Sequence, residues 1–190
     1  MNYDKVEDTF FEAFEGKYVR ALITGPSEAI VKRAAYDSTS TPSAVIGRVE
    51  GGVECFLDSS KTPDGRFGAV VQYWLGSDDV EKFAFELSYR LRQDVLVKPF
   101  TRIFDYSSTD SEEYIEMMDI VGHCGDGYEW IVEEYGRKMI NVPIAVPDFQ
   151  IEEKFKINDG IMGGNFWYLC QTPEAVIDAG DAIIEAIMGV

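Results

Sequence analysis

The sequence predicts an α+β fold in which two helices cover one face of an antiparallel sheet. Strand-like and helix-like runs alternate over residues 18–104 in the order β-α-β-β-α-β, with a strand-like run after each helix. That order is typical of a ferredoxin-like sandwich. We expect a first, ferredoxin-like lobe at residues 1–147 and the start of a second, incomplete ferredoxin-like lobe, built as β-β-α, at residues 148–190.

The first strand and helix are indicated by aromatic, β-branched and small apolar residues. Tyr18–Thr24 is such a run and ends at Gly25-Pro26, which predicts a buried strand. Ser27 is expected to begin a helix, because the apolar residues that follow share one side at helical spacing (Ile30, Val31, Ala34 and Ala35). The hydroxyl-rich run Ser38–Ser43 predicts a loop.

Two further strands are predicted before the second helix. Ala44–Val49 and Val53–Leu57 are expected to form a strand that a turn at Gly51-Gly52 interrupts. Phe67–Leu75, after the loop that ends in Arg66, has the strongest strand pattern of the chain.

The second helix and the strand after it complete the predicted first lobe. Ser77 is a good N-cap for a helix whose apolar residues have helical spacing (Val80, Phe83, Ala84, Leu87 and Leu91). Val95–Phe104 then reads as a strand, and Pro99 places it at an edge or a bulge of the sheet.

An acidic excursion is expected at residues 103–136. It contains ten acidic residues and no Lys or Arg (Asp105, Asp110, Glu112, Glu113, Glu116, Asp119, Asp126, Glu129, Glu133 and Glu134). We interpret it as solvated surface in preference to a cation site, because the spacing matches no metal-binding loop. The sequence therefore predicts no metal site.

The second half continues with strands and a final helix. Strands are expected within residues 125–146, with a hairpin turn at Gly136, and then at Phe149–Ile157 and Gly163–Cys170. Thr172 is the expected N-cap of the last helix, whose apolar face is regularly spaced (Val176, Ala179, Ile183, Ile184 and Ile187). This face needs a partner, either the first layer or another chain.

Composition and charge limit the classes of partner. The 190 residues contain 17 Lys and Arg against 34 Asp and Glu, a net charge of −17 that repels nucleic acid and anionic lipid. No apolar run approaches the roughly 20 residues of a membrane helix, and the N-terminus lacks a signal-peptide pattern. We therefore expect neither nucleic acid nor a membrane as partner, and a cytoplasmic location.

The surplus of negative charge predicts a response to salt. Because like charges repel within and between subunits, screening by moderate to high salt should strengthen an oligomer and raise the melting temperature. Sedimentation and thermal unfolding at low and high salt measure this effect, and equal values in both buffers would contradict it.

The three cysteines indicate a reducing environment rather than a disulfide framework. Cys55, Cys124 and Cys170 are odd in number and contain no C-x-x-C pair, so we interpret them as small buried hydrophobic residues. A nucleophilic Cys124 activated by His123 is disfavoured, because neighbouring residues on a strand point to opposite faces.

Four short segments carry the motifs that attract attention. They are EDTFFEAFEG at 7–16, TPDGR at 62–66, GDGY at 125–128 and MGGNFWY at 162–168. Taken singly, they predict core aromatic residues at Phe10, Phe11 and Phe14, a turn at 63–65 and a hairpin tip at 126–127. The pair Gly163-Gly164 permits either a close approach to a ligand or a tight turn.

In this order, the segments resemble the formylmethanofuran:tetrahydromethanopterin formyltransferase family. EDTFFEAFEGKYVRALIT, TPDGRFG, GDGY, GGNF and AIIEAIMGV carry the resemblance over nearly all 190 residues. It implies transfer of a formyl group from methanofuran to N5 of tetrahydromethanopterin in one-carbon metabolism. Both molecules are then substrates, with no bound cofactor or metal. It also implies two ferredoxin-like lobes and a homo-oligomer.

The resemblance also places the family's catalytic glutamate beyond the position that matches Val190. The chain is therefore expected to be either a formyltransferase that obtains the rest of its second lobe from elsewhere, in a separate chain, or a non-catalytic paralogue or fragment that binds a pterin or methanofuran or serves as a structural subunit.

Formyl transfer requires donors for an oxyanion and a carboxyl group that carries protons. Backbone N–H groups near Gly163, Gly164 and Asn165 are candidate donors, with Thr9 and Phe166 as further substrate contacts. The carboxyl candidates are Asp8, Asp64 and Asp126, and none can be assigned as catalytic.

Anionic groups on both substrates require a local cation. Arg66 is the candidate, whereas Arg20, Lys98 and Arg102 are interpreted as ordinary ion-paired residues.

Overall fold

The computed structural model describes residues 12–44, 48–163 and 167–189. They divide into two compact units, one within 15–161 and the other formed by 12–14 together with 162–163 and 167–189. We call the first the sheet unit and the second the terminal unit. The two are described separately.

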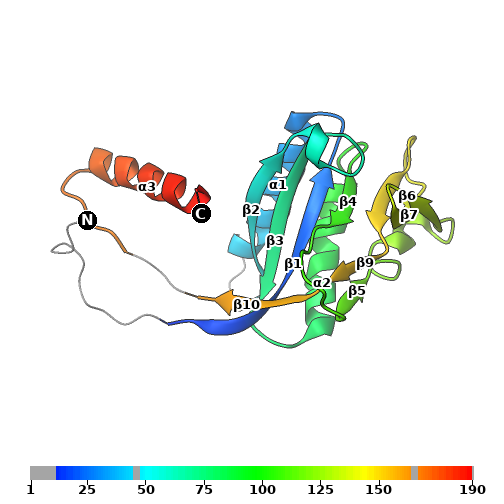
Figure 1. The fold of residues 1–190 in the computed structure, drawn as a ribbon, viewed down its shortest axis with the longest axis horizontal. Coiled ribbons are helices and arrows are strands. Elements are labelled where there is room, and N and C mark those ends of the chain that lie inside the picture. The colour runs from blue at the N-terminus through cyan, green and yellow to red at the C-terminus, as the bar shows by residue number, and fades with distance from the viewer. Residues whose placement is uncertain (1–11, 45–47, 164–166, 190) are drawn as a thin grey trace. The chain divides into compact units, whose positions relative to one another are not determined.

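The centre of the sheet unit is an antiparallel sheet with helices on one face (Figure 1). Its strands β1 (Phe14–Thr24), β2 (Glu50–Leu57), β3 (Gly68–Leu75) and β4 (Arg102–Asp105) lie in the order β2-β3-β1-β4. Helices α1 (Glu28–Ala44) and α2 (Val80–Arg90) provide the crossovers. The fold is therefore α+β, as predicted.

The sheet continues beyond β4. Strand β8 (Phe149–Glu152) pairs in parallel with β4, and β7 (Arg137–Val142) and β6 (Trp130–Glu134) follow as an antiparallel hairpin. Tyr135 and Gly136 form its turn with φ of 58° and 68°, which confirms the predicted turn at Gly136. β10 (Asn158–Met162) pairs with β1, and β5 (Tyr114–Glu116) pairs with β9 (Lys154–Lys156).

The main core lies between the helices and the sheet. Alternate residues of β1 and β3 pack against Val31, Ala34 and Ala35 of α1 and against Phe83 and Leu87 of α2. On the sheet face turned away from the helices, which we call the second face, a smaller buried cluster contains Leu22, Val70, Phe104 and Met139. The second face therefore has a smaller apolar core than the face that the helices cover.

Two predicted boundaries in the first half were wrong. The run Ser38–Ser43 is helical up to Ala44 rather than a loop, because Ser38 and Thr39 satisfy their hydroxyls on the Ala35 carbonyl. Gly51-Gly52 lies inside β2, so no turn interrupts this strand, and its irregularity is a bulge between Val53 and Cys55. Ala44 ends a helix, and no strand covers the described part of Ala44–Val49.

The predicted strand at Val95–Phe104 was also mostly wrong. A π-helical turn at Leu91–Leu96 prolongs α2, because Leu91 and Val95 are buried in the main core, and only Arg102–Asp105 is a strand. The N-cap of α2 is Asp79, whose carboxylate accepts from the Lys82 N–H at 2.9 Å, in place of Ser77.

In the second half of the chain, the structure differs from the predicted elements at three places. His123 and Cys124 lie on a 3₁₀ helix, Gly122–Gly125, and not on a strand, and Asp126 caps that helix in the left-handed region instead of forming a hairpin tip. A bend separates β8 from β9, so Phe149–Ile157 is not one strand. Of the predicted strand Gly163–Cys170, residues 164–166 lie outside the described residues, and 167–170 have no regular structure.

Exposure partly confirms the expectations for charge and cysteine. Most of the acidic excursion is exposed, whereas Asp105 is buried. Cys55 and Cys124 are half-buried, but Cys170 is exposed, contrary to prediction. None of the described helices is long and apolar enough to cross a membrane, and the described residues hold no group of three His, Cys, Asp or Glu side chains suited to a metal ion.

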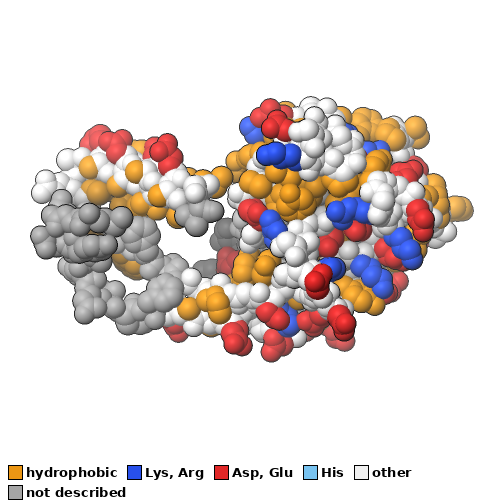
Figure 2. All heavy atoms as spheres, viewed as in Figure 1, with side chains coloured by type: hydrophobic (Ala, Val, Ile, Leu, Met, Phe, Trp, Pro, Cys, Tyr) orange, Lys and Arg blue, Asp and Glu red, His pale blue; other side chains and the backbone are white. Residues whose placement is uncertain are grey.

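The terminal unit contains helix α3 (Pro173–Met188). Thr172 caps it as predicted, accepting from the Ala175 N–H at 3.2 Å. Hydrophobic side chains gather along one side of this helix (Figure 2), and several of them are largely exposed (Ile177, Ile184, Ile187 and Met188).

Candidate functional site

Strand pairing and one tight turn assemble a polar cluster at one end of the sheet. In register, Thr24 at the end of β1 lies opposite Arg102 on β4 and opposite Gly68 on β3. The TPDGR turn precedes β3, so it brings Asp64 and Arg66 to this end. We call Thr24, Asp64, Arg66 and Arg102 the Asp64 cluster.

The TPDGR segment forms this turn for local reasons. Gly65 has a φ of 68°, which favours glycine, and its N–H donates to the Thr62 carbonyl at 3.3 Å. The Thr62 hydroxyl closes the loop by donating to the Arg66 carbonyl at 2.6 Å. The predicted turn is thereby confirmed, and it holds the side chains of Asp64 and Arg66 toward the sheet.

Asp64 is the centre of the cluster, and its side chain is 0% exposed. Its Oδ2 accepts from Thr24 Oγ1 at 2.7 Å, Arg66 Nε at 2.6 Å and Arg102 NH1 at 3.1 Å. One carboxylate thus neutralises one of two guanidinium charges. With two arginines and one aspartate, the cluster carries 2 − 1 = +1 in a protein of net charge −17.

The two arginines differ in the donors that they have left. Arg66 uses Nε on Asp64, NH1 on the Phe100 carbonyl at 2.6 Å and NH2 on Thr24 at 2.9 Å. Arg102 donates to Asp64 through NH1, and its Cζ lies 5.2 Å from the ring centre of Tyr135. Among the described residues, Arg102 Nε is buried without a partner. Arg102 is therefore the residue with donors for a ligand.

The environment sets the ionisation of Asp64 and Arg66. Burial by itself raises the pKa of Asp64, but the Thr24 hydrogen bond and the Arg66 charge outweigh it and hold the pKa below its ordinary value. Burial lowers the pKa of Arg66 against the opposing effect of Asp64. Asp64 therefore stays ionised near neutral pH and acts as a fixed counter-charge.

A second carboxylate group lies further along the second face. Arg137 NH1 donates to Glu152 Oε2 at 2.6 Å and to the Asp105 carbonyl at 2.9 Å. The ring of Phe104 connects this group to the cluster, since it lies 5.9 Å from Arg137 Cζ and 5.6 Å from the ring of Tyr135. Burial raises the pKa of Glu152 and that of Asp105.

These raised pKa values predict a dependence of stability on pH. A carboxyl whose pKa is higher in the folded state binds protons more readily there, so its contribution to the free energy of unfolding grows as pH falls from neutral through the folded pKa. We expect Glu152→Gln to reduce this growth between pH 7 and pH 5. Urea unfolding at both pH values measures it, and identical pH slopes in the wild type and variant would contradict the assignment.

The predicted cations are all ion-paired. Arg20 NH2 lies 2.5 Å from Glu54 and Lys98 Nζ lies 3.0 Å from Asp37, as expected for ordinary ion pairs. Arg102 is also paired, but with the buried Asp64, so it belongs to the cluster with Arg66.

The other predicted site residues are not brought to the cluster by any described contact. Asp8, Thr9, Gly164, Asn165 and Phe166 lie outside the described residues. Gly163 has a φ of 101°, and a Cβ there would lie 3.0 Å from the Glu12 carbonyl oxygen. Its close approach is thus to the N-terminal segment of the same unit. Asp126 is exposed at the end of the 3₁₀ helix.

Sequence reasoning missed Thr24, Tyr135, Arg137 and Glu152. Thr24 is the last residue of a buried strand, and Tyr135 precedes the hairpin glycine. Their places next to a predicted strand end and a predicted turn were therefore weak indications in the sequence. Arg137 and Glu152 have no such signal, because their meeting depends on the register between β7 and β8.

Comparisons with known proteins match nearly the whole chain to one family. A family profile described as formylmethanofuran-tetrahydromethanopterin formyltransferase matches residues 1–144, and one described as its proximal lobe matches residues 147–190. A formyltransferase-like protein of Methanothermobacter marburgensis is 61% identical over 98% of this chain and 63% of its own length. The formyltransferase of Methanothermobacter thermautotrophicus is 35% identical over 100% of this chain and 63% of its own length.

Solved structures show the same fold. The formyltransferase from Methanosarcina barkeri superposes with a TM-score of 0.84 at 32% identity, over 96% of this chain and 61% of its own. The formyltransferase/hydrolase complex from Methylorubrum extorquens gives 0.83 at 24% identity, over 95% and 60% of the two chains, which is a likeness of fold alone. The chain spans less than two thirds of the length of these relatives. It belongs to the formylmethanofuran-tetrahydromethanopterin formyltransferase family.

Proposed function

We propose that this chain takes part in formyl transfer from formylmethanofuran to N5 of tetrahydromethanopterin. Membership of the family supports the reaction class. The observation that carries the proposal is the Asp64 cluster, a half-buried group of charge +1 on an otherwise acidic protein. A substrate bearing carboxylate or phosphate groups needs such a site on a chain of this charge.

Each member of the cluster has a distinct role in this proposal. Arg102 binds an anionic group of a substrate through the donors that it does not use on Asp64. Asp64 and Thr24 fix the positions of both guanidinium groups, and Arg66 ties the cluster to the carbonyl of Phe100. The ring of Tyr135 forms an apolar surface beside Arg102, and the buried ring of Phe104 packs edge to face against it.

The proton-carrying carboxyl is, in this proposal, not Asp64. A carrier must be able to take up a proton near neutral pH, whereas the Thr24 hydrogen bond and the two arginines hold the pKa of Asp64 low. Glu152 and Asp105 have raised pKa values, but Arg137 and backbone groups occupy part of their hydrogen-bonding capacity. We infer that the carrier is supplied from outside the described residues, as the resemblance of the chain to the family implies.

The proposed architecture follows the same resemblance. The order β2-β3-β1-β4 with two crossover helices supports a ferredoxin-like first lobe, at residues 1–147. Residues 148–190 then belong to a second lobe, and further copies of the chain are its partners in a homo-oligomer. The exposed apolar residues of α3 support a need for such a partner.

Binding without catalysis is the second candidate. Two relatives at 61% and 60% identity are named formyltransferase-like. Two relatives named formyltransferase are 35% and 37% identical. This difference favours a test that separates binding from turnover.

The test measures turnover and binding on the same purified 190-residue protein. Formylmethanofuran and tetrahydromethanopterin are mixed with the protein, and formation of the formylated pterin is followed against the uncatalysed rate. Calorimetry measures the affinity of each substrate separately. Turnover supports the enzyme, and binding without turnover supports the second candidate. The absence of both from the folded protein would overturn the proposed function.

A further inference from the structure

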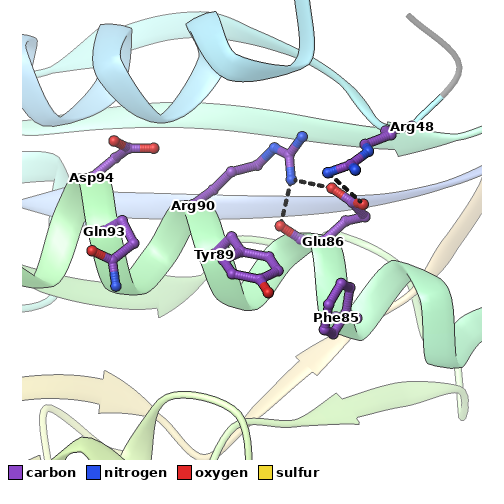
Figure 3. Close-up of a pocket in the computed structure, with 7 residues that line it drawn as sticks. All are labelled: Arg48, Phe85, Glu86, Tyr89, Arg90, Gln93 and Asp94. Carbon is purple, nitrogen blue, oxygen red and sulfur yellow. Dashed lines mark hydrogen bonds and ion pairs between the residues drawn. The ribbon is translucent and has the colours of Figure 1, made fainter. Parts of the chain in front are cut away.

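A cavity of about 430 Å³ lies beside α2, on the helix side of the sheet. Figure 3 shows its lining residues, which come from α2, from the π-helical turn that prolongs it, and from Arg48 before β2. Its volume falls in the range of small-molecule sites. Because the Asp64 cluster lies on the second face, this cavity is a separate location.

Two arginines share one carboxylate at one end of this cavity. Arg90 NH1 donates to the Glu86 carbonyl at 2.5 Å and to Glu86 Oε2 at 2.9 Å, and Arg48 NH1 lies 3.5 Å from Glu86 Oε1. Arg90 is 1% exposed, and among the described residues its Nε is buried without an acceptor. A buried guanidinium N–H without an acceptor is costly, and a ligand oxygen would remove this cost. This end of the cavity carries a charge of 2 − 1 = +1.

Two aromatic side chains, Phe85 and Tyr89, also line the cavity, together with the polar Gln93 and Asp94. Phe85 and Tyr89 are 55% and 47% exposed, and their rings meet edge to face with centres 4.8 Å apart. Such a pair offers an apolar surface on which a third ring can pack. Figure 3 places Phe85 beneath the Arg48–Glu86 contact, whereas Asp94 lies at the opposite end. The ring pair and the two arginines thus line the same cavity.

We propose that this cavity binds a small aromatic carboxylate, with the carboxylate on Arg48 and Arg90 and the ring against Phe85 and Tyr89. A carboxylate matches the planar fork of an arginine, and binding would give Arg90 the acceptor that it lacks. Asp94 repels the ligand from the other end and so fixes its orientation. The proposal does not depend on formyl transfer.

Phenylacetate is the probe, and binding to the ¹⁵N-labelled 190-residue protein is followed by amide chemical shifts. We expect saturable shifts in residues 85–94. Acetate, which lacks the ring, and benzyl alcohol, which lacks the charge, should each bind at least about fivefold more weakly. Equal affinity for all three compounds would overturn the proposal, because it requires both the ring and the charge.

Variants locate the site. Arg48→Ala should weaken phenylacetate binding about tenfold, because it removes one charge-assisted hydrogen bond, and Asp94→Asn should strengthen it. Arg33→Ala is the matched control, since Arg33 is an exposed arginine on α1 paired with Asp37. Circular dichroism confirms that each variant is folded. Absence of saturable shifts, or equal affinity in Arg48→Ala and Arg33→Ala, would overturn the proposal.

Discussion

Replacing Asp64 with alanine is expected to lower the free energy of unfolding by about 3–5 kcal/mol, the cost of breaking a buried ion pair from one side. Asp64 has a fully buried side chain and holds Thr24, Arg66 and Arg102 at once. Without it, two guanidinium groups of like charge remain close together and partly buried, each with an 80% covered side chain. Urea unfolding measures the loss.

The control for this change is Asp110→Ala. Asp110 is exposed, and its side chain has no hydrogen bond or ion pair to another described residue, so its removal should change stability by less than about 0.5 kcal/mol. Asp64→Asn keeps the shape but removes the charge, so it should fall between the two. A loss in Asp64→Ala no larger than in Asp110→Ala would show that the cluster contributes nothing to stability.

The ionisation of Asp64 also predicts how the free energy of unfolding changes at acid pH. The pKa of Asp64 is lower in the folded than in the unfolded state. Its contribution to the free energy of unfolding is therefore fully present at pH values above its unfolded-state pKa. This contribution is lost as the pH falls through the pKa of Asp64 in the folded state. Asp64→Asn should therefore remove part of the acid-induced loss of stability below about pH 4. A steeper loss in the variant than in the wild type would contradict this sign.

Replacing Arg102 with alanine is expected to weaken binding of the anionic substrate about 10- to 100-fold. This is the effect of removing one or two charge-assisted hydrogen bonds. Arg102 has donors that are free among the described residues, whereas Arg66 has used its donors on Asp64, Thr24 and Phe100. Calorimetry with each substrate measures the loss, and turnover, where present, should show it chiefly in kcat/KM.

Two further variants separate binding from folding. Arg102→Lys keeps the charge but not the planar fork, so it should restore part of the affinity. Arg33→Ala removes an exposed arginine outside the cluster and should leave affinity unchanged. Unchanged affinity in a folded Arg102→Ala protein would exclude Arg102 from the substrate site and leave the cluster a purely structural role.

The strands and helices were predictable wherever one pattern dominated. Local composition predicts the strands at Tyr18–Thr24 and Gly68–Leu75 and the helix cap at Thr172. It did not predict the helical turn at Val95 and Leu96, because these β-branched and apolar residues continue into Val97 as a strand-like run, and only burial of Val95 in the main core makes the helical turn more favourable. Gly51-Gly52 likewise suggested a turn, but pairing with β3 holds these residues in a strand.

The sequence by itself determined the family, the α+β class and the nearness of Asp64 to Arg66, since only Gly65 separates them within one tight turn. Only the tertiary structure decided that Thr24 and Arg102, some 40 residues away on either side, complete the cluster. Their meeting depends on the register in which β1 pairs with β3 and β4. Register is set by burial of one sheet face against the helices, a long-range effect that local spacing does not contain.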